Sequence, residues 1–288
     1  MAGAPDLNSG PTISRILLGT ELRKLREEAG ITPQEAGAAI RASHAKISRL
    51  ELGRVGFKER DIEDLLTLYD VHDEKQRAGY LSLVSRSNER GWWSQDTDLL
   101  PSWFEMYLRL EQEASFIRTF QVQFVPGLMQ SPQYARNVIR RGSPPIPTTR
   151  STAASSSGWR GRRSCTNGAP RLWAVVDEAA LTRPFGPTAV MRGQFEHILE
   201  LTALPNVTLQ VLPFRAGMHA AAGGPFSILR FAVSDLPDVV YLEQLNSSTY
   251  VDKRSDVEEY LWVMERLTVQ AHTPVNTKAF VHGLLKQL

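Results

Sequence analysis

The sequence contains a single cysteine, Cys165, among its 288 residues. A lone thiol cannot form a disulfide within the chain or a multi-thiolate metal site. The sequence also lacks any apolar run of the roughly 20 residues that a membrane-spanning helix needs. Residues 1–12 are polar and rich in Pro and Gly, without the basic-then-apolar order of a signal peptide. We therefore expect a cytoplasmic protein with no membrane partner and a disordered N-terminus over residues 1–13.

Net charge is small as well, at +2, and does not by itself indicate a nucleic-acid partner. Its distribution is more informative. Residues 15–60 hold ten Lys or Arg and six Glu, a net of +4, whereas residues 61–142 hold nine Lys or Arg and twelve Asp or Glu, a net of −3. The positive charge thus lies in the first segment, where a phosphate-facing module requires it. The length allows one small and one medium domain, each with its own core.

Short amphipathic helices are predicted in the first seventy residues, over 17–29, 33–40, 44–52 and 59–69. The second helix begins with a capping-box pattern, because Thr32 and Glu35 flank a proline at the first helical position. Ser43 is a good N-cap for the third helix. The buried positions of the second and third helices are expected to be Ala36, Ala39, Ile40, Ile47 and Leu50.

Short helices joined by a tight turn, the third polar on one face, are typical of a helix-turn-helix unit. In such a unit the third helix enters the major groove and its first residues reach base edges. Lys46 and Arg49 can donate to guanine or to phosphates, and Gln34 can bond the DNA backbone or an adenine edge. The predicted DNA-binding residues are Gln34, Ser43, His44, Ala45, Lys46, Ser48 and Arg49. Two alternatives stay open. In the first, the unit is a helical bundle whose basic face is only solvated. In the second, His44 only contacts a phosphate or packs on the neighbouring helix.

The segment LRKLREEAGITPQEAGAAIRASHAKISRLELGR resembles the XRE (Cro/cI-type) helix-turn-helix domain, over roughly residues 16–70. The resemblance implies a domain at residues 14–72 that binds specific double-stranded DNA. It also implies that Glu51 pairs back to an arginine of the first helix, Arg23 or Arg26, instead of reading bases. We expect a homodimer, since one small module reads too few base pairs for tight specific binding.

Helix and strand signals mix from residue 100 to 288, which predicts a larger mixed α+β domain behind the all-α one. Residues 73–99 are expected to form the link between the domains, with a helix over 73–90 followed by Trp92 and Trp93. These tryptophans are either a docking surface or, as we prefer, core anchors. Strands are predicted at 115–124, 171–176, 207–212, 226–231 and 239–242, and helices at 103–114, 131–141, 191–204, 256–271 and 274–285.

The second half resembles the C-terminal domain found behind XRE-type domains in actinobacterial regulators of the Scr/WhiJ-like kind. Matching stretches include FVPGLMQSPQYAR, WAVVDEAALTRP and VEEYLWVMERL. The resemblance implies an antitoxin-like regulatory domain that binds a small partner protein encoded nearby, with no catalytic residue and no cofactor. Two functions stay open: a regulator whose second domain binds this partner or another effector, and an interaction protein that sequesters the partner and binds DNA only for autoregulation.

A third possibility, an enzyme with an appended DNA-binding domain, depends on Asp177, Glu178 and His219. The carboxylate pair follows a predicted strand, where acid–base catalysis is conceivable, but a helix N-terminus that favours acids explains it better. His219 has no His or Cys nearby at ligand spacing. Glycine-rich phosphate loops, GxSxG and HExxH are all absent from the sequence. We therefore expect no catalytic site and no metal site.

One segment, residues 143–168, departs from globular composition. It is rich in Ser, Pro, Thr and Arg and contains no acidic residue. It is either a disordered linker or the product of out-of-frame translation, because plausible codons read one nucleotide earlier encode a charged, capped helix. We favour the frame change. Its four arginines account for the positive net charge of the chain, so the sequence pI of 8.7 is no argument for global affinity for nucleic acid.

Overall fold

A computed structural model describes residues 11–53, 55–88, 102–142, 170–232 and 236–288. The anomalous segment 143–168 and the tryptophans at 92 and 93 lie outside these described residues. The chain divides into two compact units, Met1–Ser94 and Gln95–Leu288, each of which is considered by itself.

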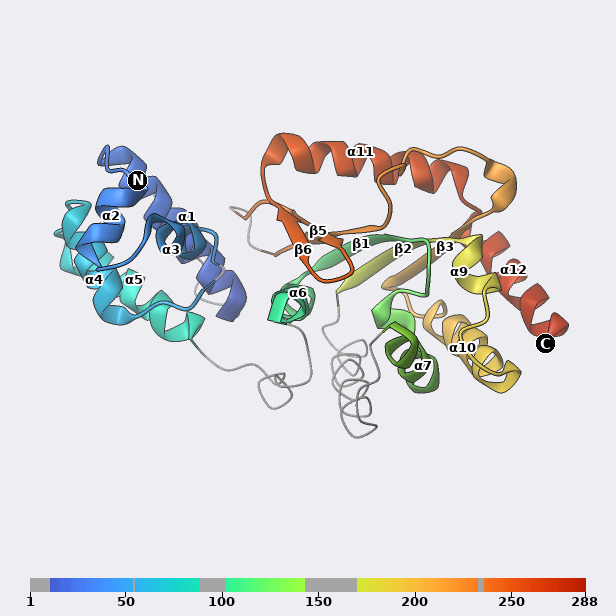
Figure 1. Cartoon of the computed structure of the whole chain (residues 1–288). Helices are drawn as coiled ribbons and strands as arrows, with labels where there is room; N and C mark the ends of the chain where they lie inside the picture. The colour runs from blue at the N-terminus through green and yellow to red at the C-terminus, as the bar shows by residue number, and fades with distance from the viewer. Residues whose placement is uncertain (1–10, 54, 89–101, 143–169, 233–235) are drawn as a thin grey trace. The chain divides into compact units, whose positions relative to one another are not determined.

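The N-terminal unit is a bundle of helices (Figure 1). Its helices are α1 (Pro11–Glu28), α2 (Pro33–Ala39), α3 (His44–Glu51), α4 (Glu59–Leu68) and α5 (Glu74–Ser87). Their apolar faces meet in one core, which includes Leu18, Leu22, Ile47, Leu50, Ile62, Leu66, Tyr80 and Leu83. Helix α5, which lies within the predicted linking helix, packs into this core and belongs to the N-terminal unit.

Two sequence predictions about this unit are wrong. Helix α1 starts well before Leu17, and residues 11–13, expected to be disordered, are helical. The extra turns are held because Ser14 is fully buried and Arg15 donates a hydrogen bond to the backbone oxygen of Ser87 on α5. Ala39 is exposed instead of buried, since Gly37 takes the place facing the next turn of the chain.

The C-terminal unit is built on a six-stranded mixed sheet in the order β3-β2-β1-β4-β5-β6. The first three of these strands run parallel to one another, and β4, β5 and β6 continue the sheet with antiparallel pairing. The strands are β1 (Phe116–Gln121), β2 (Arg171–Asp177), β3 (Val207–Leu212), β4 (Phe226–Arg230), β5 (Val239–Glu243) and β6 (Ser248–Val251).

Helices cover both faces of this sheet, which confirms the predicted all-α plus α+β fold class (Figure 1). Helix α11 lies across one face, and α6, α7 and α10 lie on the other. The helices are α6 (Ser102–Glu113), α7 (Pro132–Gly142), α9 (Glu178–Thr182), α10 (Thr188–Leu201), α11 (Arg254–Gln270) and α12 (Pro274–Gln287), with short 3-10 turns η3 (Gly127–Met129) and η5 (Phe214–Ala216).

A buried glutamine ties α10 to the loop in front of α7. The side-chain oxygen of Gln194 accepts the backbone N–H of Ser131 at 2.6 Å, and its amide nitrogen donates to the backbone oxygen of Met129 at 2.7 Å. Gln194 is fully buried. Because both backbone groups are buried away from water, this one side chain satisfies groups that would otherwise be costly to bury.

Candidate nucleic-acid interface

Side-chain caps fix the starts of α2 and α3. The Thr32 hydroxyl accepts the Glu35 N–H at 3.3 Å, and the Thr32 N–H donates to the Glu35 carboxylate at 2.8 Å, which confirms the predicted capping box. The Ser43 hydroxyl accepts the N–H of Lys46 at 3.3 Å, as expected of an N-cap. Each cap satisfies an N–H group that has no partner within its own helix.

The turn between these helices is short and closely packed. A Cβ atom at Gly37 would lie 2.7 Å from the backbone oxygen of Ala42, so α2 approaches the turn as only glycine permits. Arg41 takes a left-handed conformation with φ at 53°, which reverses the chain between the helices. Like Gly37, Gly19 permits two backbones to approach closely, here those of α1 and α3. A Cβ atom at Gly19 would lie 2.6 Å from the backbone oxygens of Leu50 and Glu51.

A buried ion pair joins α1 to the end of α3. The guanidinium of Arg26 donates to both carboxylate oxygens of Glu51, at 2.6 and 3.1 Å, and also to the backbone oxygen of Ile31. Both side chains of the pair are over nine-tenths buried. Of the two arginines that the sequence offered, Arg26 is therefore the partner of Glu51, while Arg23 pairs with Glu27 at the surface.

Most of the predicted DNA-binding side chains are exposed to solvent. Helix geometry advances about 100° per residue, so the buried Ile47 and Leu50 leave one side of α3 facing outward. The outward stripe of α3 consists of His44, Ala45, Ser48 and Arg49, all of them exposed. Gln34 and Ser43 are exposed as well, on the first turn of α2 and at the cap of α3.

The polar groups of this stripe differ in how they are engaged within the protein. The Ser48 hydroxyl donates to the backbone oxygen of His44 at 3.2 Å, and Nε of Arg49 donates to the backbone oxygen of Ala45 at 3.3 Å. These bonds orient both side chains along the helix. Among the described residues the structure records no partner for the two terminal nitrogens of Arg49, which present the forked donor geometry that guanine or a phosphate accepts.

Lys46 is placed differently from the other predicted residues. It lies at the edge of the buried face of α3, and its side chain is only 33% exposed. Its ammonium is 2.7 Å from a carboxylate oxygen of Asp61 on the first turn of α4. The positive charge of Lys46 is thus offset within the protein, a contact that spacing along α3 does not reveal.

The same contact brings further basic residues to the interface. Asp61 is flanked in the sequence by Lys58, at the N-cap of α4, and by Arg60, and both are exposed. Because Asp61 reaches Lys46, the first turn of α4 lies beside the start of α3. The exposed Arg41 stands in the turn that precedes α3. None of these three cations was placed at the site from the sequence, although Arg41 and Lys58 precede helix starts and Arg60 lies in a first helical turn, which was a usable signal.

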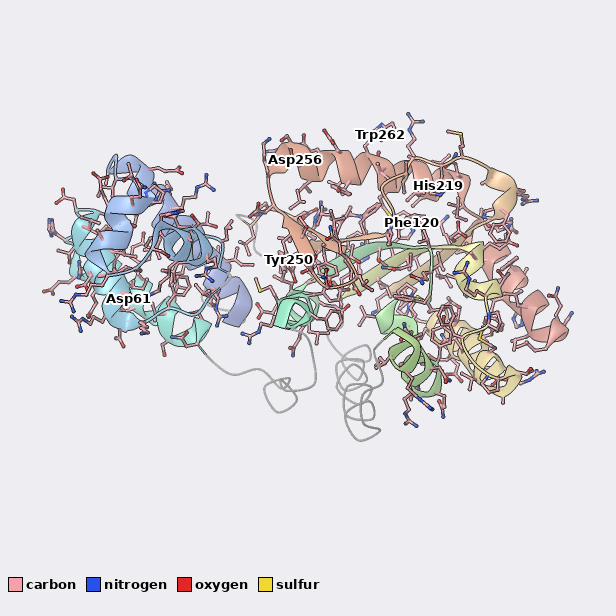
Figure 2. All side chains as sticks on the ribbon, in the orientation of Figure 1. Asp61, Phe120, His219, Tyr250, Asp256 and Trp262 are labelled. Atoms are coloured by element: carbon pink, nitrogen blue, oxygen red, sulfur yellow. The ribbon has the colours of Figure 1, made fainter. Side chains whose placement is uncertain are left out.

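The acidic pair considered for catalysis has structural partners. The Asp177 side chain accepts the N–H of Ala179 at 2.8 Å and caps α9, and the Glu178 carboxylate accepts the backbone N–H of Phe214 at 2.8 Å. This confirms the interpretation of Asp177 as a helix N-terminus. His219 stands edge-on to Phe120, with ring centroids 5.4 Å apart (Figure 2). Within the described ranges no three His, Cys, Asp or Glu residues converge as metal ligands would.

Two capped short helices, a tight turn and an exposed polar stripe that carries Arg49 define the N-terminal unit as a helix-turn-helix domain, the class of domain with which DNA-binding regulators contact DNA. A family model described as a helix-turn-helix domain matches residues 17–78. A second, described as a domain of unknown function (DUF5753), matches residues 104–283. That match covers more than half of the chain, so the protein belongs to the DUF5753 family.

No curated protein and no solved structure matches the chain. In the part of the chain that the structure describes, no helix combines the length and the apolarity needed to cross a membrane.

Proposed function

We propose that the protein is a sequence-specific transcriptional regulator that reads DNA with the outward stripe of α3 and acts as a homodimer in the cytoplasm. The observation that carries this proposal is the stripe itself: exposed donors on a helix held rigidly by Ser43, Gly37 and the Arg26–Glu51 pair. No Asp or Glu occurs from His44 to Arg49 to repel phosphate. A rigid scaffold with solvent-facing donors is what direct readout of base edges requires.

Affinity and selectivity come from different residues in this proposal. Arg49 and His44 reach base edges from the outward stripe, with the methyl group of Ala45 available for a thymine methyl. Phosphate contacts come from Gln34 at the start of α2, from the basic residues Arg41 and Lys58, and from the N–H groups at the helix starts. Two copies would then read two half-sites about one helical turn apart.

We further propose that the C-terminal unit binds a small partner protein or another effector and has no catalytic role. The resemblance to antitoxin-like regulators suggests the partner, and exposed apolar side chains support it. Trp262 and Val269 are 53% and 83% exposed on α11, and Trp262 lies on the side of the helix away from the sheet (Figure 2). Met218, 95% exposed, belongs to a loop whose backbone accepts a hydrogen bond from Gln270 of the same helix. Apolar side chains gathered in this way mark interaction surfaces.

Genome-wide mapping of bound DNA sites, with and without the product of the neighbouring gene, tests both the sequence-specific DNA binding and the binding of a partner protein. We expect a defined set of sites that share a two-fold symmetric sequence and whose occupancy changes with the partner. Binding without sequence preference would contradict the first part. Unchanged occupancy, together with no co-purification of the neighbouring product, would contradict the partner.

Sequestration of the partner, with DNA binding kept for autoregulation, is the second candidate, favoured by the exposed apolar side chains of α11. In that case the mapped sites would be confined to the protein's own promoter. Sites spread over many promoters would exclude it.

A further inference from the structure

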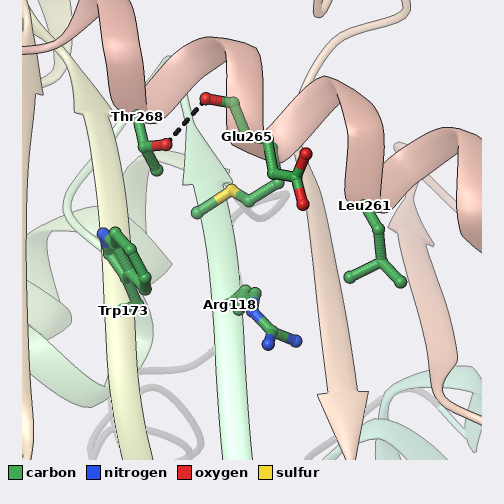
Figure 3. A pocket seen from close by; sticks show the side chains of 6 residues that line it. Arg118, Trp173, Leu261, Glu265 and Thr268 are labelled. Carbon is green, nitrogen blue, oxygen red and sulfur yellow. Dashed lines mark hydrogen bonds between the residues drawn. The ribbon is translucent and has the colours of Figure 1, made fainter.

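A small cavity lies between α11 and the sheet face that the helix covers (Figure 3). Its volume is about 70 Å³, and its lining consists of Arg118, Trp173, Leu261, Met264, Glu265 and Thr268. Glu265 is exposed, so the cavity reaches the surface beside it. The lining combines apolar walls with one cationic and one anionic group.

Arg118, which lines this cavity, carries an unsatisfied donor. It stands on β1 next to Trp173 of β2, and its side chain is 18% exposed. Its Nη1 atom is fully buried and has no hydrogen-bond partner in the structure. Asp238 lies 4.0 Å from Nη1, beyond hydrogen-bond distance. A buried charged donor without an acceptor is costly, and native proteins seldom leave one without a reason.

Asp238 is already ion-paired with another arginine, Arg230. Arg230 donates to both of its carboxylate oxygens, at 2.8 and 2.7 Å. Burial lowers the pKa of Arg118, and the neighbouring charges of Arg230 and Arg171 act in the same direction, while the carboxylates of Asp238 and Glu265 act against them. The guanidinium of Arg118 also lies 4.1 Å from the ring centroid of Phe116. Arg118, Arg230 and Arg171 thus outnumber the two carboxylates of Asp238 and Glu265 by one charge, which an added carboxylate would offset.

Glu265 faces Arg118 from the opposite wall. Figure 3 shows the Glu265 carboxylate hanging below α11, and the Arg118 side chain extending from the strand lower in the view with its guanidinium turned away from the helix; Leu261 lies to one side. Among the described residues the structure records no hydrogen bond or ion pair for this carboxylate. Only the backbone oxygen of Glu265 is engaged, by the hydroxyl of Thr268 at 2.7 Å. Arg118 thus offers donors for a carboxylate, and Glu265 offers acceptors for an ammonium.

We propose that this cavity binds a small zwitterion of the α-amino-acid type, with its carboxylate on Arg118, its ammonium toward Glu265 and its side chain against Leu261 and Trp173. A guanidinium fork matches a carboxylate geometrically. A dry cavity of about 150 Å³ accommodates benzene, so a cavity about half that size limits the ligand to a glycine, an alanine or a close analogue. This ligand would be the effector of the proposed function. Its binding does not depend on that proposal; only its effect on regulation does.

Calorimetric titration of the full chain, without DNA or partner, tests the assignment. Alanine should bind saturably with a Kd of about 1 mM or below, within what so few atoms can supply. Propionate, which lacks the ammonium, and ethylamine, which lacks the carboxylate, should bind at least about tenfold weaker, as expected for a lost charged partner. Phenylalanine should not bind, because the cavity is too small.

Variants separate this site from nonspecific effects. E265Q removes an exposed charge and should abolish the preference for alanine over propionate. R118K should weaken alanine binding about tenfold or more, since an ammonium cannot reproduce the fork. E259Q removes another exposed carboxylate of α11, one that does not line the cavity, and it should behave as the parent.

Three outcomes would overturn the assignment: no saturable binding of alanine or glycine, which would leave the cavity to water; equal binding of propionate and alanine; or identical behaviour of E265Q and E259Q. Because E265Q alters a solvent-facing side chain, the test stands even if R118K fails to fold. Since no DNA is present, failure here is distinguishable from failure of the DNA-binding proposal.

Discussion

The ammonium of Lys46 on α3 lies 2.7 Å from the carboxylate of Asp61 on α4. Both side chains are partly shielded from water, at 33% and 16% exposed. The two cations of the recognition helix α3 therefore differ: Lys46 is ion-paired with Asp61, while Arg49 is exposed to solvent. Arg49 should therefore contribute more to DNA binding than Lys46, although both fall in the same stretch of sequence.

Neutralising Asp61 should strengthen DNA binding. In D61N the charge of Lys46 is no longer offset, so it can attract a phosphate and release one more counterion. We expect affinity to rise several-fold at low salt and the slope of log K against log salt to steepen by about 1. Fluorescence anisotropy over a salt series measures both quantities. D64N removes an equal, exposed charge from the same helix, and an identical result for the two variants would refute a specific role for the pair.

Breaking the buried Arg26–Glu51 pair should loosen α1 from α3. E51Q keeps the shape of the side chain but leaves the Arg26 guanidinium buried without its anion, at a cost of about 3–5 kcal/mol. Hydrogen–deuterium exchange of α1 and α3 peptides should accelerate accordingly. R23Q, which breaks the exposed pair between Arg23 and Glu27 without removing an anion from Arg26, should leave exchange nearly unchanged. Equal protection in both variants would show that the buried pair does not hold these helices together.

A methyl group at Gly37 should separate α2 from the turn before α3. Because the added Cβ would meet the backbone oxygen of Ala42 at 2.7 Å, G37A should displace the recognition helix and reduce specific DNA affinity at least about tenfold. Nothing lies within 4 Å of a Cβ built at Gly79 of α5. G79A should therefore stabilise its helix by roughly 0.5–1 kcal/mol and leave DNA binding intact. Full binding by G37A would contradict the close packing of this corner.

In the C-terminal unit, Gln194 should be hard to replace. Q194M keeps the approximate volume but leaves the Ser131 N–H and the Met129 carbonyl buried without partners, at a cost of about 1–3 kcal/mol. Urea unfolding followed by tryptophan fluorescence measures the change. Q133M, at an exposed position of α7, is the matched control. If Q133M costs as much as Q194M, the network around Gln194 does not stabilise the loop.

Local patterns in the sequence predicted much of this fold. The capping box at Thr32 and the cap at Ser43 depend on side chains within three residues, so the local order of residues reveals them. The strand at 207–212 was predicted with its observed bounds. Strand β6 was missed because it is four residues long, lies at the sheet edge and has no buried position to create a pattern.

Features that depend on contacts between residues far apart in the chain could not be predicted from the sequence. Lys46 is indistinguishable from Arg49 until α4 places Asp61 beside it. The cavity at Arg118 exists because the parallel register sets Arg118 next to Trp173 and because α11 brings Glu265 over both. Such neighbours are far apart in the chain, and only the packed fold brings them together.

The most direct test of DNA recognition by α3 is selection of binding sequences from random DNA. The parent chain should enrich one symmetric motif. The double variant K46A/R49A, compared with K24A/R23A on the outer side of α1, should lose that motif and keep only weak, salt-sensitive binding. Enrichment of the same motif by K46A/R49A with undiminished strength would contradict the account.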